Sequence, residues 1–148
     1  MDLMIRTART GDAAVLTAHN IAMALETEGR ALDLDKAAKG VDAVLADPGK
    51  GFYVVAEHDG RVIGQLMITF EWSDWRNGNF WWIQSVYVVP DHRGRGIFTR
   101  LFEEVGNMAR AQGVVGIRLY VEAENETAME AYRKLGMQES HYRMWEEA

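Results

Sequence analysis

Apolar residues recur along this chain with two different periods, and each change of period marks a predicted element. Alternation of β-branched and aromatic residues is typical of strands, whereas apolar residues at every third or fourth position are typical of amphipathic helices. The predicted strands cover residues 4–7, 52–56, 62–72, 80–89, 116–121 and 137–145. The predicted helices begin near Thr10 or Asp12, near Asp33 or Asp35, at Ile97 and at Asn125, and end near Gly29, Pro48, Gly113 and Gly136.

The order of these elements is β-α-α-β-β-β-α-β-α-β. Asp59-Gly60 predicts a tight hairpin between two neighbouring strands. The helix that begins at Ile97 connects two strands that we expect to be parallel. The pattern therefore predicts an α/β (α+β) fold with a mixed, mainly antiparallel central sheet and about four flanking helices. Since no linker, repeat or low-complexity segment interrupts it, residues 1–148 are expected to form a single domain.

Composition narrows the class of protein. Hydrophobic residues make up 48% of the chain and charged residues 26%, as in a globular protein. The absence of cysteine excludes disulfides and thiolate zinc sites, and no metal site is expected. No run approaches the ~18 apolar residues of a membrane span. Because the first residues lead directly into a strand pattern without a signal peptide, we expect a cytoplasmic protein.

The net charge of −6 argues against nucleic acid as a partner, because nucleic-acid binding normally needs a broad positive surface. Positive charge is concentrated locally in Arg93, Arg95 and Arg100. Such a patch favours a small polyanion over a duplex.

The loop after the fourth predicted strand carries the clearest chemistry. It contains Gly94 and Gly96 and opens directly into a helix. Helix N-termini present unpaired N–H groups, and glycines let an anion approach the backbone, so the order strand, glycine loop, helix suits a phosphate or pyrophosphate. A tight surface turn with solvated arginines is the alternative interpretation. The dinucleotide fingerprint G-x-G-x-x-G fails at Thr99, and the Gly-Lys-Ser/Thr of a P-loop is absent.

Two motifs resemble those of the GNAT N-acetyltransferase superfamily. The first is similar to its acyl-CoA loop, Arg/Gln-x-x-Gly-x-Gly/Ala, with Phe98 where the family usually has a small residue. The second, residues 121–137, looks like V-x-x-x-N-x-x-A-x-x-x-Y-x-K-x-G-F, with Met137 in place of the final Phe. Both occur in the family's order, the predicted elements follow the GNAT fold, and the resemblance covers nearly the whole chain.

The resemblance implies an enzyme that transfers an acetyl group from acetyl-CoA to an amine. It assigns Tyr132 as the general acid that protonates the departing thiolate, although a tyrosine packed in the core is the alternative. Asn125 is expected both to cap its helix and to contact the pantetheine or the acceptor. The residues that the resemblance assigns to acetyl-CoA through their backbone are Val86, Tyr87 and Val88 for pantetheine, and Arg93, Gly94, Arg95, Gly96, Ile97, Phe98 and Thr99 for pyrophosphate. A backbone N–H of residues 86–88 is expected to serve as oxyanion donor, and a homodimer is expected because dimers are common in similar proteins.

The general base is not assigned by the sequence. Many relatives carry a Glu on the central strand, whereas this chain has Gln84 near that place, which cannot accept a proton usefully. The alternatives are a water chain or one of four side chains for which an ordinary surface or capping role is the favoured interpretation: Glu71, Glu26, Glu28 and His19.

Four of the five tryptophans lie around one predicted loop, near two carboxylates. Aromatic and acidic side chains together can hold a cationic amine. Glu71, Trp72, Trp75 and Gln84 are therefore candidate acceptor-binding residues, for a small basic amine or a peptide amine. Core packing or a dimer surface would explain the same tryptophans. A domain that binds acyl-CoA without catalysis is the second functional hypothesis, because Phe98 and Gln84 depart from the family's pattern.

Overall fold

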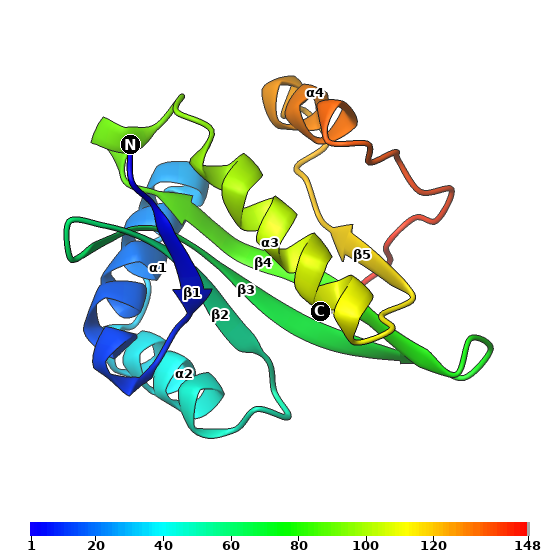
Figure 1. Ribbon diagram of the computed structural model, residues 1–148, viewed down its shortest axis with the longest axis horizontal. Helices are drawn as coiled ribbons and strands as arrows, with labels where there is room; N and C mark the ends of the chain where they lie inside the picture. Colours follow the sequence, from blue (N-terminus) through cyan, green and yellow to red (C-terminus); the bar gives the residue numbers. More distant parts are fainter. Residues whose placement is uncertain (148) are drawn as a thin grey trace.

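A computed structural model describes residues 1–147 of the chain (Figure 1). Its strands are β1 (Met4–Thr7), β2 (Phe52–His58), β3 (Arg61–Ser73), β4 (Gly78–Val88) and β5 (Gly116–Leu119). Its helices are α1 (Ala13–Glu28), α2 (Leu34–Ala46), α3 (Ile97–Ala111) and α4 (Glu126–Lys134). Short 3-10 turns precede α1 and follow β4, at Thr10–Asp12 and Pro90–His92.

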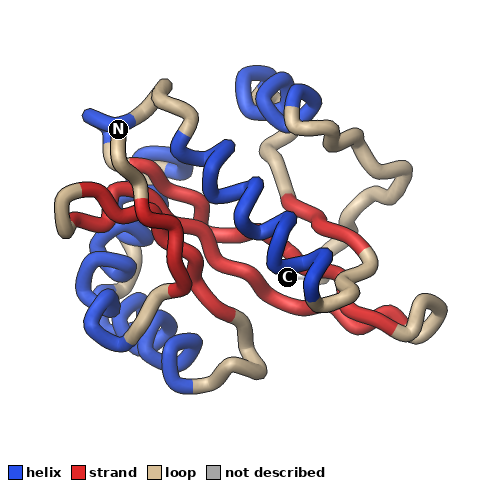
Figure 2. Tube along the Cα trace, in the orientation of Figure 1, coloured by secondary structure: helices blue, strands red, loops and turns tan. Residues whose placement is uncertain are grey.

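The five strands form one open sheet in the order β1-β2-β3-β4-β5. The first four are antiparallel to their neighbours, and β5 is parallel to β4 because α3 crosses over between them. The helix α3 lies across one face of the sheet, and α1 and α2 lie on the other (Figures 1 and 2). This arrangement confirms the predicted mixed, mainly antiparallel sheet and its parallel crossover.

Turn chemistry fixes the register of the sheet at the β2–β3 hairpin. Asp59 and Gly60 both adopt positive φ, at 50° and 74°. Two consecutive positive φ values define the turn type that matches the twist of a two-residue hairpin, and Asp-Gly is a favoured sequence for it. The predicted hairpin is therefore confirmed.

The apolar stripe of α3 sets the distance between this helix and the sheet. Ile97, Leu101 and Val105 are at most 2% exposed and belong to the larger of two core clusters. Gly64 of β3 lies beneath them, where an added Cβ would be 2.9 Å from the Ile97 side chain. Since that separation is too short for carbon atoms in contact, a glycine here lets the first turn of α3 lie against β3.

The predicted strand over residues 137–145 is wrong. Within residues 137–147 the chain adopts no strand and runs irregularly after α4 (Figure 2). Tyr142 is 66% exposed and Trp145 is 91% exposed. Strand propensity depends on packing and on a neighbour for the backbone hydrogen bonds. This segment has neither: Gln138, Glu139 and Ser140 interrupt its apolar pattern, and no strand beside it supplies a ladder.

No helix in the described part of the chain combines the length and the apolar character that crossing a membrane requires.

Candidate functional site

A bulge in β4 is the first feature of the site. Gln65 of β3 pairs with Tyr87, and Met67 pairs with Gln84. One residue of β3 therefore lies between the two pairs, whereas two residues of β4 do. Ser85 lies in the bulge with φ of 51°, in the left-handed region that a non-glycine residue seldom adopts. A bulge turns backbone groups out of the regular ladder, and here it does so at the middle of the sheet.

The open edge of β4 is the second feature. The pairing between β4 and β5 ends at Ile83 and Leu119, whereas β4 continues to Val88. The backbone N–H of Val89 donates to the carbonyl of Ile63 on β3 at 2.9 Å. Because backbone groups alternate between the two edges of a strand, those of Val86 and Val88 point to the open edge, and those of Tyr87 point to β3.

The loop between β4 and α3 has the geometry of an anion cradle. Gly94 and Gly96 adopt φ of 76° and 74°, and a Cβ on either would meet no atom within 4 Å. Gly96 caps α3 without a side-chain hydrogen bond, so the first N–H groups of the helix lack a capping partner. Positive φ, open space and free helix N–H groups together fit a phosphate or pyrophosphate bound by backbone donors.

The loop borders a cavity of about 200 Å³. Its wall is formed by the end of β4, the loop, the first turn of α3 and one side of α4: Val88, His92, Arg93, Gly94, Gly96, Ile97, Phe98, Thr99, Ala131 and Leu135. The cavity thus brings the glycine loop, Ile97, Phe98, Thr99 and the end of the open edge of β4 together.

Tyr132 of α4 lies next to this cavity. Its ring meets Phe98 edge to face, with 5.9 Å between the ring centroids. Burial raises the pKa of the Tyr132 hydroxyl, so it stays protonated at neutral pH. No hydrogen bond holds this hydroxyl within residues 1–147, which leaves it free to donate to a ligand.

Phe98 departs from the family's pattern, and its ring has a packing role. It lies between Phe102 and Tyr132, at 6.1 Å and 5.9 Å between centroids. A small residue at this position would leave Tyr132 without its aromatic neighbour on α3. The large side chain therefore supports Tyr132 as well as forming part of the cavity wall.

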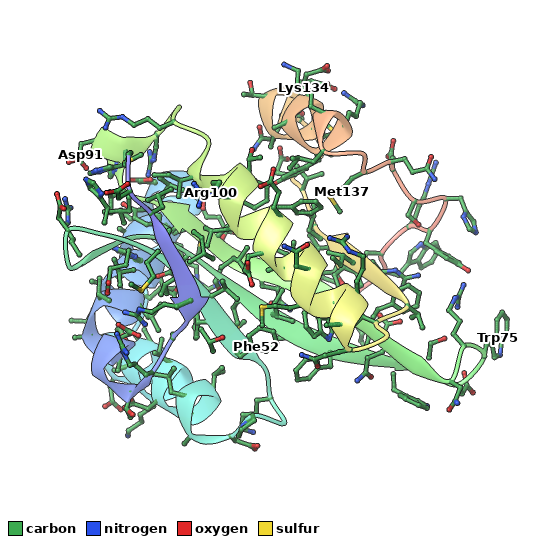
Figure 3. All side chains as sticks on the ribbon, viewed as in Figure 1. Phe52, Trp75, Asp91, Arg100, Lys134 and Met137 are labelled. Atoms are coloured by element: carbon green, nitrogen blue, oxygen red, sulfur yellow. The ribbon has the colours of Figure 1, made fainter. Side chains whose placement is uncertain are left out.

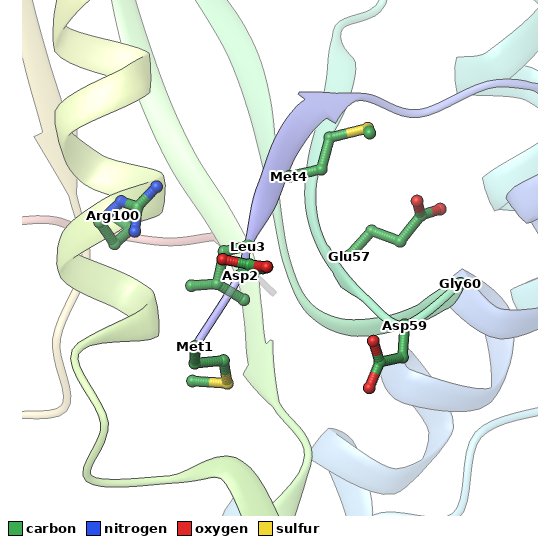
Figure 4. A pocket seen from close by; sticks show the side chains of 8 residues that line it. All are labelled: Met1, Asp2, Leu3, Met4, Glu57, Asp59, Gly60 and Arg100. Atoms are coloured by element: carbon green, nitrogen blue, oxygen red, sulfur yellow. The ribbon is translucent and has the colours of Figure 1, made fainter.

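The three arginines that the sequence grouped have different surroundings. Arg93 donates to a Glu26 carboxylate oxygen on α1 and to the carbonyl of Val88, both at 2.8 Å. Its guanidinium also lies 5.3 Å from the centre of the Tyr87 ring. Arg95 is exposed. Arg100 points away from the loop and lines a separate pocket of about 590 Å³ with residues 1–4, Glu57, Asp59 and Gly60 (Figure 4).

Asn125 caps α4, as predicted: its side-chain oxygen accepts from the N–H of Ala128 at 3.1 Å. This bond occupies the side chain with its own helix. It accounts for the residue structurally, and its contact with pantetheine or acceptor stays a prediction.

The four side chains considered as general base are in unequal environments. Glu26 pairs with Arg93, and Glu71 accepts from Trp82 at 3.0 Å and from Arg118 at 3.2 Å. Glu28 is exposed at the end of α1. His19 is 8% exposed, and burial lowers the pKa of its imidazole, so it is neutral at pH 7.

The candidate acceptor residues do not form one group. Gln84 donates to Thr69 at 2.7 Å, and Glu71 lies further along the same face of β3. Trp72 is 60% exposed and Trp75 is 88% exposed, at the tip of the β3–β4 hairpin (Figure 3). The tip is at the opposite end of β4 from the glycine loop, roughly 35 Å away for eleven residues.

Gln65 is a residue that the sequence analysis did not single out. It is fully buried and contacts the bulge. The sequence signal that could have identified Gln65 is a polar residue among the apolar positions of a central strand, since buried polar groups require partners. The sequence alone did not reveal those partners, because they come from α1 and β4.

Comparison with known proteins gives this geometry a context. The model of the acetyltransferase (GNAT) family matches residues 18–137. The crystal structure of a possible acetyltransferase from Clostridium difficile 630 is 47% identical, covers 99% of this chain and 97% of that chain, and superposes with a TM-score of 0.93.

Two curated relatives are more distant. A mycothiol acetyltransferase of Corynebacterium aurimucosum is 31% identical over 80% of this chain and 40% of that protein. A thialysine N-epsilon-acetyltransferase of Bos taurus is 33% identical over 53% of this chain and 45% of that protein. The chain thus spans less than half the length of these two relatives. The family match over most of the chain shows that this chain belongs to the acetyltransferase (GNAT) family, and the open edge of β4 and the glycine loop agree with it.

Proposed function

We propose that the chain is an acetyl-CoA-dependent N-acetyltransferase that acts on the primary amine of a small molecule or peptide, by direct attack in a ternary complex. The single observation that carries this proposal is that the open edge of β4 and the glycine loop line one cavity, and that Tyr132 packs on Phe98 in the wall of that cavity. The name of the thialysine relative supports an amine acceptor.

The chain's own groups divide the work by position. Backbone N–H groups of residues 94–99 hold the pyrophosphate, because the Arg93 N–H already donates to the Pro90 carbonyl at 3.3 Å. The outward backbone groups of Val86 and the N–H of Val88 pair with pantetheine as an added strand would, while the Val88 carbonyl accepts from the Arg93 side chain. Tyr87 contributes its ring rather than its backbone, because the Arg93 guanidinium packs over that ring. Bound acetyl-CoA supplies the activated acyl group.

The reaction needs two proton transfers. A carbon–nitrogen bond forms as a carbon–sulfur bond breaks, so the amine loses a proton and the departing sulfur gains one. Tyr132 gives the second proton, and its raised pKa keeps that proton available at neutral pH. The Val86 N–H stabilises the developing oxyanion, a role that is worth about 3 kcal/mol in comparable sites.

Thermal unfolding with millimolar acetyl-CoA or free CoA tests the binding part. A ligand at a hundredfold excess over Kd stabilises the folded state by about 2.7 kcal/mol, which raises Tm measurably. An amine panel with detection of released thiol then tests turnover. No shift with either ligand would refute the site.

Binding without turnover on a broad panel would favour the second hypothesis, a domain that binds acyl-CoA without catalysis. The observations that favour it are Phe98 in the loop and Gln84 in place of a strand carboxylate. A homodimer also stays a prediction, and size-exclusion chromatography with light scattering measures it directly.

A further inference from the structure

Gln65 is a fully buried polar side chain in the middle of β3, on the face covered by α1. It lies beside Tyr87, its partner across the ladder, at the step where β4 bulges. A buried amide is stable only when its donors and acceptor are paired. Each of the three contacts of Gln65 therefore carries information about how the amide is oriented.

The amide of Gln65 has one allowed orientation. Its nitrogen lies 3.2 Å from the carbonyl oxygen of Ser85 and 2.9 Å from the side-chain oxygen of Asn20. A backbone carbonyl can only accept, so the group facing Ser85 must be the N–H₂. The amide oxygen then faces Nδ1 of His19 at 3.0 Å and accepts its proton.

The neighbours of the amide reinforce this orientation. The His19 ring packs on Tyr87 with 4.9 Å between ring centroids, and Asn20 donates to the Tyr53 hydroxyl at 3.3 Å. The hydrogen bond to Gln65 requires the neutral tautomer of His19 that is protonated at Nδ1. Nδ1 also carries a proton in the charged form, so this hydrogen bond does not depend on the ionisation of His19.

The planarity of the peptide bond transmits this orientation to the site. In a trans peptide the C=O of one residue and the N–H of the next point in opposite directions. Gln65 holds the Ser85 carbonyl from the α1 side of the sheet. The N–H of Val86 must therefore point away from Gln65, which agrees with its place on the open edge of β4.

We propose that Gln65 is a positioning residue that aims the Val86 N–H at the developing oxyanion, through its hydrogen bond to the Ser85 carbonyl. The inference rests on the proposed function, because it needs an acyl carbonyl at the open edge of β4. The bond also polarises the peptide unit and makes the Val86 N–H a stronger donor. It holds Ser85 in a backbone conformation that serine seldom adopts.

Two variants test the donor specifically. Gln65→Met removes the polar group while keeping the length of the side chain, and Gln65→Leu removes it with a shorter side chain. Thr17→Val is the matched control: it removes a side-chain hydrogen bond to the Ala13 carbonyl on α1, outside the contacts of Gln65. Chemical denaturation shows which variants are folded, and the other measurements use the folded ones.

The first readout needs no ligand. In the free protein, the ¹⁵N resonance of Val86 reports hydrogen bonding to the preceding carbonyl. We expect this resonance to move in each folded Gln65 variant and to stay in place in Thr17→Val. An unmoved Val86 resonance in Gln65→Met would overturn the proposal, and this outcome does not depend on any ligand or on turnover.

The second readout separates kcat from KM. We expect kcat to fall at least tenfold in Gln65→Met, up to the roughly 10²–10³-fold loss that follows removal of an oxyanion donor. KM for acetyl-CoA should change by less than about twofold, because the loop contacts are intact. A wild-type kcat in this variant would overturn the role of Gln65. Absence of turnover in the wild type would instead refute the proposed function.

Discussion

Replacing Tyr132 with Phe removes one oxygen atom whose contribution can be worked out from its surroundings. The hydroxyl makes no hydrogen bond within the described residues, and the ring contact with Phe98 survives the change. The free energy of unfolding should therefore change by less than about 0.5 kcal/mol. Loss of a general acid lowers kcat by about 10²–10⁴-fold, which corresponds to about 2.7–5.4 kcal/mol of transition-state stabilisation. KM for acetyl-CoA should stay constant, because the cavity keeps its shape.

The pH dependence gives a second test of Tyr132. Burial raises the pKa of its hydroxyl above the ordinary value of about 10. The acid is thus present at all lower pH values, and kcat should fall only as pH rises through the raised pKa. Steady-state assays of wild type, Tyr132→Phe and the exposed control Tyr142→Phe measure both effects. An unchanged kcat in Tyr132→Phe, or an identical alkaline fall in that variant, would refute the assignment.

Three further predictions concern the loop, the ion pairs and the core. Gly96→Asp should abolish binding of acetyl-CoA, measured by calorimetry, because it places a carboxylate at the anion cradle. Gly113 has a similar positive φ with open space around it, so Gly113→Asp carries the same backbone strain and should bind acetyl-CoA normally. Hydrogen bonds from Arg6 lower the pKa of the Asp12 carboxyl group. This carboxylate therefore stabilises the fold above its unfolded pKa of about 3.9, and the stabilisation is lost as pH falls through the folded pKa. Asp12→Asn should flatten the fall of Tm in acid, and an unaltered acid profile would contradict this. Leu101→Ala should lower the free energy of unfolding in urea by about 2–5 kcal/mol, since the side chain is fully buried, and a loss below 1 kcal/mol would show that α3 packs loosely.

Local patterns in the sequence predict most of the fold. The amphipathic stripe of α3 and the Asp59-Gly60 turn depend on neighbours in the chain, so the element and the hairpin follow from the residues alone. The segment 137–145 was misread because strand formation depends on a partner strand, which no local pattern encodes. The length of β5 was overestimated by two residues for the same reason, since its pairing stops at Leu119.

The site was predictable where its chemistry is local. The glycine loop and Tyr132 belong to contiguous motifs, and the cavity unites the loop with α4. The contacts of Gln65 and the pairing of Arg93 with Glu26 join residues far apart in the sequence. Trp75 is a case in which nearness in sequence was misleading. It lies at the exposed tip of the β3–β4 hairpin, far from the glycine loop.

The Glu26–Arg93 pair links the first helix to the first residue of the cradle. Both side chains of this pair are nearly half exposed, so the pair stabilises the position of the loop by about 1 kcal/mol or less. Under the proposed function, a ligand at the loop and a ligand at α1 would share this contact. A ligand that displaced α1 would then change the affinity for acetyl-CoA by at most about fivefold, and acetyl-CoA would change the affinity for that ligand by the same factor.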